Sequence, residues 1–100
     1  MLKYRVIIAS RADKMLLRHA EFLSRVSLPA VRKFLHAFEE LISNLEENPH
    51  LYQVDDDSNL PSGKYRRAVF LERYKVIYCM EEKTVYVDAV VDCRQNQIQI

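Results

Sequence analysis

Residues 64–92 read KYRRAVFLERYKVIYCMEEKTVYVDAVVD, and this stretch decides the fold. It contains three runs rich in β-branched and aromatic residues, which are typical of strands: Lys64–Leu71, Arg73–Glu81 and Thr84–Asp92. The polar connections at Glu72 and at residues 81–83 are short, so neighbouring runs are expected to pair as antiparallel hairpins. Neither connection has the Asn-Gly pair of the tightest turns, which leaves the register open.

The chain before this stretch predicts one strand and two helices. Apolar and mostly basic residues alternate from Leu2 to Ile8, which is the period of a strand with one inward face. Helical spacing starts at about Ser10, which can act as an N-cap, and ends near Val26. The inward face of this first helix is expected to hold Ala12, Leu16, His19 or Ala20, and Leu23.

A second helix is predicted from Ser27, its N-cap, to Asn48-Pro49, with Pro29 in the first turn. Its apolar stripe is the clearest periodic pattern in the chain. The stripe consists of Val31, Leu35, Phe38, Ile42 and Leu45, widened by Leu28, Phe34 and Leu41.

The predicted element order is β-α-α-β-β-β. It indicates an α+β fold in which two helices pack on one face of a mostly antiparallel, twisted sheet. With 100 residues, of which 49% are apolar, residues 1–100 are expected to form a single domain around one core. Residues 50–63 hold Asp55, Asp56, Asp57 and the one glycine, Gly63, and are expected to form a solvated acidic loop.

Several functional classes are excluded by what the sequence contains. No run approaches the roughly 20 apolar residues of a membrane span, and residues 1–10 do not resemble a signal peptide, so a cytoplasmic protein with no membrane partner is expected. The three aspartates lack a ligand spacing, and His19, His36 and His50 form no zinc motif. A single glycine excludes a Walker A loop. No metal and no cofactor are therefore expected, and His19 is expected to be a packed helix residue.

The two cysteines match neither a metal spacing nor the disulfide framework of a small secreted domain. Both are expected to be reduced. Cys79 lies within a strand run and is expected in the core, whereas Cys93 follows another run.

Positive charge is concentrated in residues 63–80, although the formal net charge of the chain is only +1. The basic residues there are Lys64, Arg66, Arg67, Arg73 and Lys75. Arginine can grip a phosphate with two hydrogen bonds and tyrosine can stack on a base, so basic and tyrosine side chains on neighbouring strands could form an RNA-binding or RNA-cutting surface. Composition alone favours the other interpretation, a solvated sheet face whose arginines prevent association at an edge.

The element order, the ENP sequence that ends the second helix and residues 65–96 resemble the RelE/ParE superfamily of toxins from bacterial type II toxin–antitoxin modules, which includes plasmid stabilisation system proteins. Such proteins typically have a basic strand, a Y-R-V-x-Y strand, a V-x-V-x strand and an end motif with arginine. The corresponding residues here are Tyr65-Arg66-Arg67, Tyr74-Lys75-Val76-Ile77-Tyr78, Val85-Tyr86-Val87 and Asp92-Cys93-Arg94-Gln95.

The resemblance implies a toxin that inhibits growth and is neutralised by a cognate antitoxin, which would lay an acidic, amphipathic segment across the basic strands. RelE-like members cut mRNA in the ribosomal A site without a metal, a reaction that needs a base, cations and an acid at one phosphate. For that catalytic activity the resemblance implies charge stabilisation by Arg66 or Arg67 and by Lys75. It also implies a phosphate contact by Arg94 and an acid or base role for Tyr78.

ParE-like members instead bind and poison DNA gyrase. This chain is closer to them in its long second helix and its end motif. Lys75 stands where arginine is common, Asp92 and Gln95 replace a histidine and an arginine, and no tyrosine follows Arg94. A third alternative is an inactive member that binds only antitoxin or nucleic acid. The resemblance leaves open gyrase or ribosome with mRNA as the target, and a homo-oligomer or a toxin–antitoxin hetero-oligomer as the assembly.

Overall fold

The computed structural model describes residues 3–55 and 63–96 of the chain. Its elements are β1 (Arg5–Ile8), α1 (Ser10–Ser24), α2 (Leu28–Glu47), the 3-10 helix η1 (Pro49–Leu51), β2 (Gln53–Val54), β3 (Arg66–Phe70), β4 (Tyr74–Glu81), β5 (Thr84–Asp92) and α3 (Cys93–Asn96).

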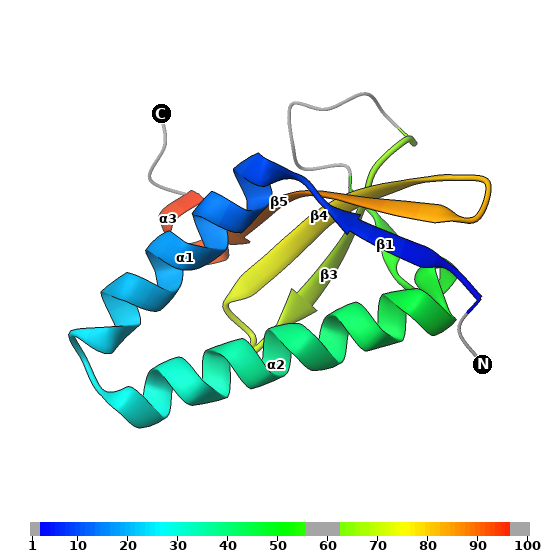
Figure 1. Ribbon diagram of the computed structural model, residues 1–100. Coiled ribbons are helices and arrows are strands. Elements are labelled where there is room, and N and C mark those ends of the chain that lie inside the picture. The colour runs from blue at the N-terminus through cyan, green and yellow to red at the C-terminus, as the bar shows by residue number, and fades with distance from the viewer. Residues whose placement is uncertain (1–2, 56–62, 97–100) are drawn as a thin grey trace.

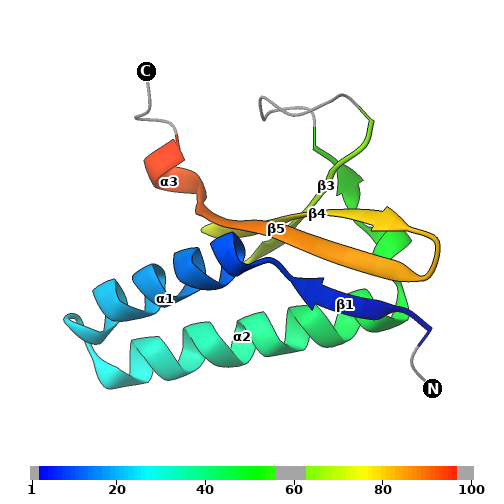
Figure 2. The same cartoon turned by 45° about the horizontal axis from the view of Figure 1, so that its top comes forward.

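The five strands form one sheet in the order β1-β5-β4-β3-β2. β1 runs parallel to β5, and the other neighbours are antiparallel. Both long helices lie on one face of this sheet (Figures 1 and 2). The predicted α+β fold is therefore confirmed. No helix within the described residues is long and apolar enough to cross a membrane.

Side chains along the strands point alternately to the two faces of the sheet, and β5 interrupts this alternation at one position. Ile77 of β4 pairs with Ala89 of β5, whereas the next residue, Tyr78, pairs with Val87. Asp88 is thus the extra residue of a β-bulge, which locally resets the side-chain alternation. Val87 and Val90 lie three positions apart, so in a regular strand their side chains would point to opposite faces of the sheet. The bulge explains why both belong to the core.

The second helix begins as predicted and buries a slightly different stripe. The hydroxyl of Ser27 accepts a hydrogen bond from the backbone N–H of Ala30 at 3.1 Å, and Pro29 lies in the first turn. The fully buried residues are Phe34, Phe38, Leu41 and Leu45. The expected stripe was therefore centred wrongly: Val31, Leu35 and Ile42 lie at its margin, and Leu28 is 63% exposed.

The first helix buries Ala12, Leu16 and Leu23, as the spacing predicts. His19 is confirmed as a packed helix residue, because its Nε2 lies 2.8 Å from the carbonyl oxygen of Val90. The expected cap was wrong. Ser10 is the first residue of the helix, and the N-cap position belongs to Ala9, which offers no side-chain hydrogen bond.

Two expectations about buried residues were also wrong. Residues 49–54 form η1 and β2, and Asp55 is buried with 1% exposure, so this end of the expected acidic loop is not solvated. Asp56 and Asp57 lie outside the described residues. Cys79 is a free, half-buried thiol opposite Tyr86 and is not part of the core cluster, because its position in β4 points away from the helices.

Candidate functional site

Arg66 and Tyr78 point to the helix side of the sheet, where both are bound to the segment that follows α2. The two residues are direct partners across β3 and β4. The Tyr78 hydroxyl donates a hydrogen bond to the carbonyl oxygen of Pro49 at 2.6 Å, and Nη1 of Arg66 donates to the carbonyl oxygen of Tyr52. Tyr78 is fully buried, and this burial raises its pKa above the ordinary value of 10.0. The hydroxyl therefore stays protonated and faces protein, not solvent.

Arg67 and Lys75 point to the opposite face and surround a buried carboxylate. Nη1 of Arg67 lies 3.3 Å from Oδ1 of Asp55, and Nζ of Lys75 lies 4.0 Å from the same oxygen. Nη2 of Arg67 also donates to Oε1 of Gln53 at 3.1 Å. The Lys75 side chain is 8% exposed and that of Arg67 is 25% exposed. This part of the basic stretch consequently has an internal counter-ion, which ties the end of β2 to β3 and β4.

Arg94 lies apart from both groups, in α3, with an exposed side chain. Its backbone N–H donates to Oδ1 of Asp92 at 3.0 Å. The other oxygen, Oδ2, accepts from Nε and Nη2 of Arg73 at 3.1 and 2.9 Å. Burial alone would raise the pKa of Asp92, but the hydrogen bonds from Arg73 and Arg94 hold it below the ordinary value of 3.8. Asp92 thus joins the start of β4 to α3.

The five residues named from the sequence are therefore distributed over three places. Alternation places Arg66 and Arg67 on opposite faces, although they are adjacent in sequence. The structure brings Arg66 to Tyr78 and Arg67 to Lys75, and it leaves Arg94 with neither pair. Within residues 3–55 and 63–96, no group of three or more His, Cys, Asp or Glu side chains could hold a metal ion.

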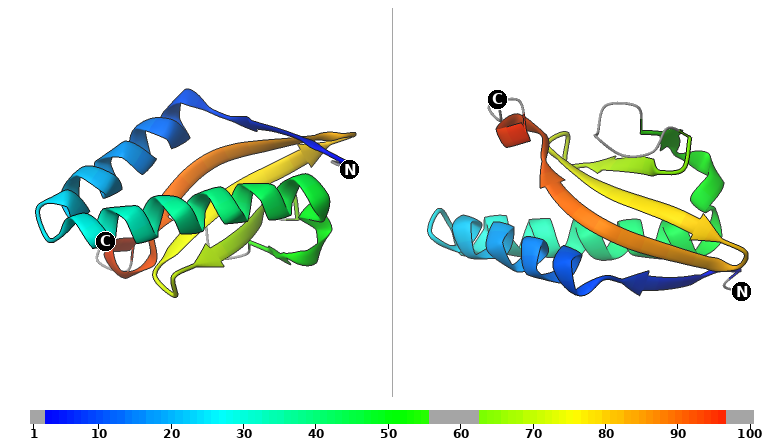
Figure 3. Two further views of the ribbon diagram at one scale, coloured as in Figure 1. Left: turned by 60° about the horizontal axis from the view of Figure 1, so that its bottom comes forward. Right: turned by 90° about the horizontal axis from the view of Figure 1, so that it is seen from above.

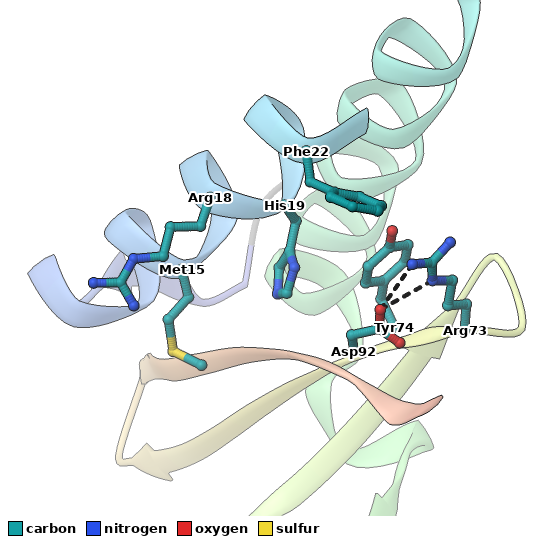
Figure 4. Close-up of a pocket in the computed structure, with 7 residues that line it drawn as sticks. All are labelled: Met15, Arg18, His19, Phe22, Arg73, Tyr74 and Asp92. Atoms are coloured by element: carbon teal, nitrogen blue, oxygen red, sulfur yellow. Dashed lines mark hydrogen bonds and ion pairs between the residues drawn. The ribbon is translucent and has the colours of Figure 1, made fainter. Parts of the chain in front are cut away.

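Sequence reasoning missed a cavity of about 300 Å³ between α1 and the adjoining ends of β4 and β5. Figure 4 shows its lining residues: Met15, Arg18, His19, Phe22, Arg73, Tyr74 and Asp92. The strand residues had been read as part of the basic stretch and of the end motif. The approach of α1 to these strand ends is a long-range contact, so no local pattern could have grouped them.

The strand order and the two helices on one face of the sheet give the fold, and a match to a family model shows the class of protein, a toxin of the RelE/ParE superfamily. Residues 6–97 match the family model described as ParE toxin of type II toxin-antitoxin system, parDE, and the chain belongs to this family.

A solved structure described as the chromosomal ParDE TA system from P. aeruginosa has a similar fold. The TM-score is 0.66, and the match covers 90% of this chain and 96% of that chain at 13% sequence identity. No curated protein matches this chain. Membership of a toxin–antitoxin family implies an antitoxin as a partner.

Proposed function

We propose that this toxin inhibits growth by binding DNA gyrase, that it does not cut mRNA, and that a cognate antitoxin neutralises it. The observation that supports the proposal is the dispersal of Arg66, Arg67, Lys75 and Tyr78. Metal-independent RNA cleavage needs a general base, an acid and cations within reach of a single phosphate. A protein that acts by binding has no such requirement.

Four members of the expected nuclease set have structural partners that compete with such a role: Arg66, Arg67, Lys75 and Tyr78. A protonated hydroxyl that donates to a buried carbonyl oxygen, as in Tyr78, is poorly suited to accept a proton from a ribose. Lys75 is 6% exposed and lies near the carboxylate of Asp55, which would repel an approaching phosphate. Arg94 has an exposed side chain, but a single guanidinium is not sufficient for this chemistry.

Exposed apolar side chains at the helical end of the molecule favour a binding function. Phe22, Val26 and Leu28 are 50%, 65% and 63% exposed and lie at or near the connection between α1 and α2. Figures 1 and 3 show this helical hairpin projecting past the end of the sheet. Exposed apolar patches are typical of surfaces that bind other proteins.

Two measurements test the proposal, one on the purified chain and one in cells that express it. The purified chain is added to a gyrase supercoiling assay, and the 5′ ends of cellular mRNA are mapped after induction from a tightly repressed promoter. We expect inhibition of supercoiling and intact mRNA. New cuts within translated codons, with gyrase unaffected, would replace the proposal by the nuclease alternative.

Arg94→Gln is the matched variant, since the Arg94 side chain is exposed and its backbone makes the structural hydrogen bond. A gyrase binder should keep its growth inhibition after this substitution. Loss of growth inhibition with an unchanged melting curve would again favour the nuclease.

A further inference from the structure

We propose that the cavity between α1, β4 and β5 is a binding site for a carboxylate that stands next to an apolar side chain in a segment of a protein partner. The proposal holds whether the target of the toxin is gyrase or mRNA, because it depends on the cavity alone. It rests on three features of the lining: a hydroxyl without a partner, a guanidinium with unused donors, and an apolar rim.

The hydroxyl belongs to Tyr74, which is 3% exposed overall. In Figure 4 its oxygen is directed toward Phe22 at the rim of the cavity. Among the described residues, Tyr74 makes ring contacts with His19 and Phe34 but no side-chain hydrogen bond. Every fully buried side-chain oxygen or nitrogen of these residues has a hydrogen-bond partner, so this unpartnered hydroxyl is not fully enclosed, and Tyr74 lines the cavity. It is a donor available to a ligand.

The guanidinium belongs to Arg73, which stacks over the Tyr74 ring with its Cζ 5.0 Å from the ring centroid. Two of its five N–H groups donate to Oδ2 of Asp92. The remaining N–H groups make no hydrogen bond to a described side chain, and Figure 4 shows the group at the edge of the cavity beside the Tyr74 hydroxyl.

The donors at the edge of the cavity favour an anion. Arg73 is the cation beside the Tyr74 hydroxyl, and its charge is partly balanced by Asp92, whereas in Figure 4 the guanidinium of the other lining arginine, Arg18, is directed away from both. Both oxygens of Asp92 already accept hydrogen bonds from within the protein, at Arg73 and at the backbone of Arg94. Buried donors that receive an ionised acceptor form stronger hydrogen bonds than neutral pairs do.

The apolar side chains at the rim of the cavity indicate which kind of molecule would carry the anion. Met15 and Phe22 line the cavity, and Phe22 is 50% exposed, so an apolar side chain of a ligand would remove this ring from water. A volume of about 300 Å³ accommodates one or two side chains. A carboxylate beside an apolar residue therefore fits both the charge and the rim, which favours an acidic peptide segment over a nucleic acid.

The test uses nuclear magnetic resonance of the full chain with two peptide probes, N-acetyl-Leu-Asp-Leu-amide and its Leu-Asn-Leu counterpart. We expect the aspartyl peptide to cause saturable shifts of the Arg73 Nε–H and of the Phe22 and Tyr74 rings. The asparaginyl peptide should bind about tenfold more weakly, because it lacks the charge. Absence of shifts at these residues, or equal binding of the two peptides, would overturn the proposal.

Two variants with matched controls locate the binding. Tyr74→Phe removes a hydroxyl that makes no hydrogen bond to a described residue, and Phe22→Ser removes a half-exposed ring, so both should fold. Each substitution should weaken the binding of the aspartyl peptide several-fold, and Tyr74→Phe should weaken it about tenfold. The controls are Tyr86→Phe on the other face and Leu17→Ser, a 59% exposed residue of α1 outside the cavity, and both should bind as the natural chain does. If uridine monophosphate or inorganic phosphate shifted the same signals and the peptide did not, the site would be one for phosphate and the proposal would be wrong.

Discussion

Replacing Tyr78 by phenylalanine separates a structural role of this tyrosine from a catalytic one. The substitution keeps the buried ring and removes the hydroxyl that donates to the carbonyl oxygen of Pro49 at 2.6 Å. Pro49 is itself buried, so its carbonyl oxygen would lose this partner without gaining access to solvent. A buried acceptor left unsatisfied costs about 1–3 kcal/mol.

We therefore expect Tyr78→Phe to lower the free energy of unfolding by about 2 kcal/mol. The loss corresponds to a fall of about 1 M in the urea midpoint if the slope is about 2 kcal/mol per molar, which is typical of a small domain. Tyr52→Phe is the matched control. Its ring lies 6.4 Å from that of Tyr78, its hydroxyl makes no hydrogen bond to a described residue, and a change of less than about 0.5 kcal/mol is expected.

The assay combines urea unfolding with growth inhibition measured well below the melting temperature of each variant. If Tyr78 is structural, the variant is less stable and still inhibits growth. A variant of unchanged stability that no longer inhibits growth would refute the reasoning and return Tyr78 to a catalytic role.

Asp55→Asn should destabilise the protein by about 3 kcal/mol in urea unfolding, because it leaves the charge of Lys75 buried without its carboxylate partner. Adding Lys75→Met should restore much of the lost stability. A double variant that is no more stable than Asp55→Asn alone would contradict this pairing. Since the pKa of Asp92 is lower in the folded protein than in the unfolded chain, its ionised form stabilises the fold above about pH 4, and that contribution is lost as the pH falls through the folded pKa. Asp92→Asn should therefore flatten the dependence of unfolding free energy on pH below about pH 4, and parallel curves for the two proteins would exclude this effect. Phe38→Ala should cost about 3–5 kcal/mol, because Phe38 is 5% exposed and lies in the core between the helices and the sheet, and an unchanged thermal melt would mean that the helix is rotated.

The elements with a repeating local pattern could be predicted from the sequence. β3, β4 and β5 are rich in β-branched and aromatic residues, and Ser27 and Pro29 mark the start of α2. Turn geometry could not be predicted in the same way. Leu71, Glu72 and Glu82 have φ angles of 54°, 55° and 55°, a region in which glycine or asparagine is usual, so the sequence lacked the ordinary turn signal.

The candidate site was predictable only as far as alternation reaches. Strand alternation assigns Arg66 and Arg67 to opposite faces of the sheet, but it does not predict which residues contact them on those faces. The partners Asp55 and Pro49 come from a segment that is held to the sheet by long-range contacts, and β2 has only two residues, too few to produce a pattern. The acidic composition of residues 55–57 pointed to solvent, whereas the buried cations of β3 and β4 attract the first of these carboxylates into the structure.

The parallel pairing of β1 with β5 has a consequence for the synthesis of the protein. Arg5 pairs with Thr84 and Ile8 with Val87, so β1 has no strand partner until β5 has been translated. The helical hairpin can form early from local contacts, whereas sheet closure must wait for β5. A ribosome that stops short of β5 would therefore release a chain in which β1 has no strand partner and the sheet is incomplete.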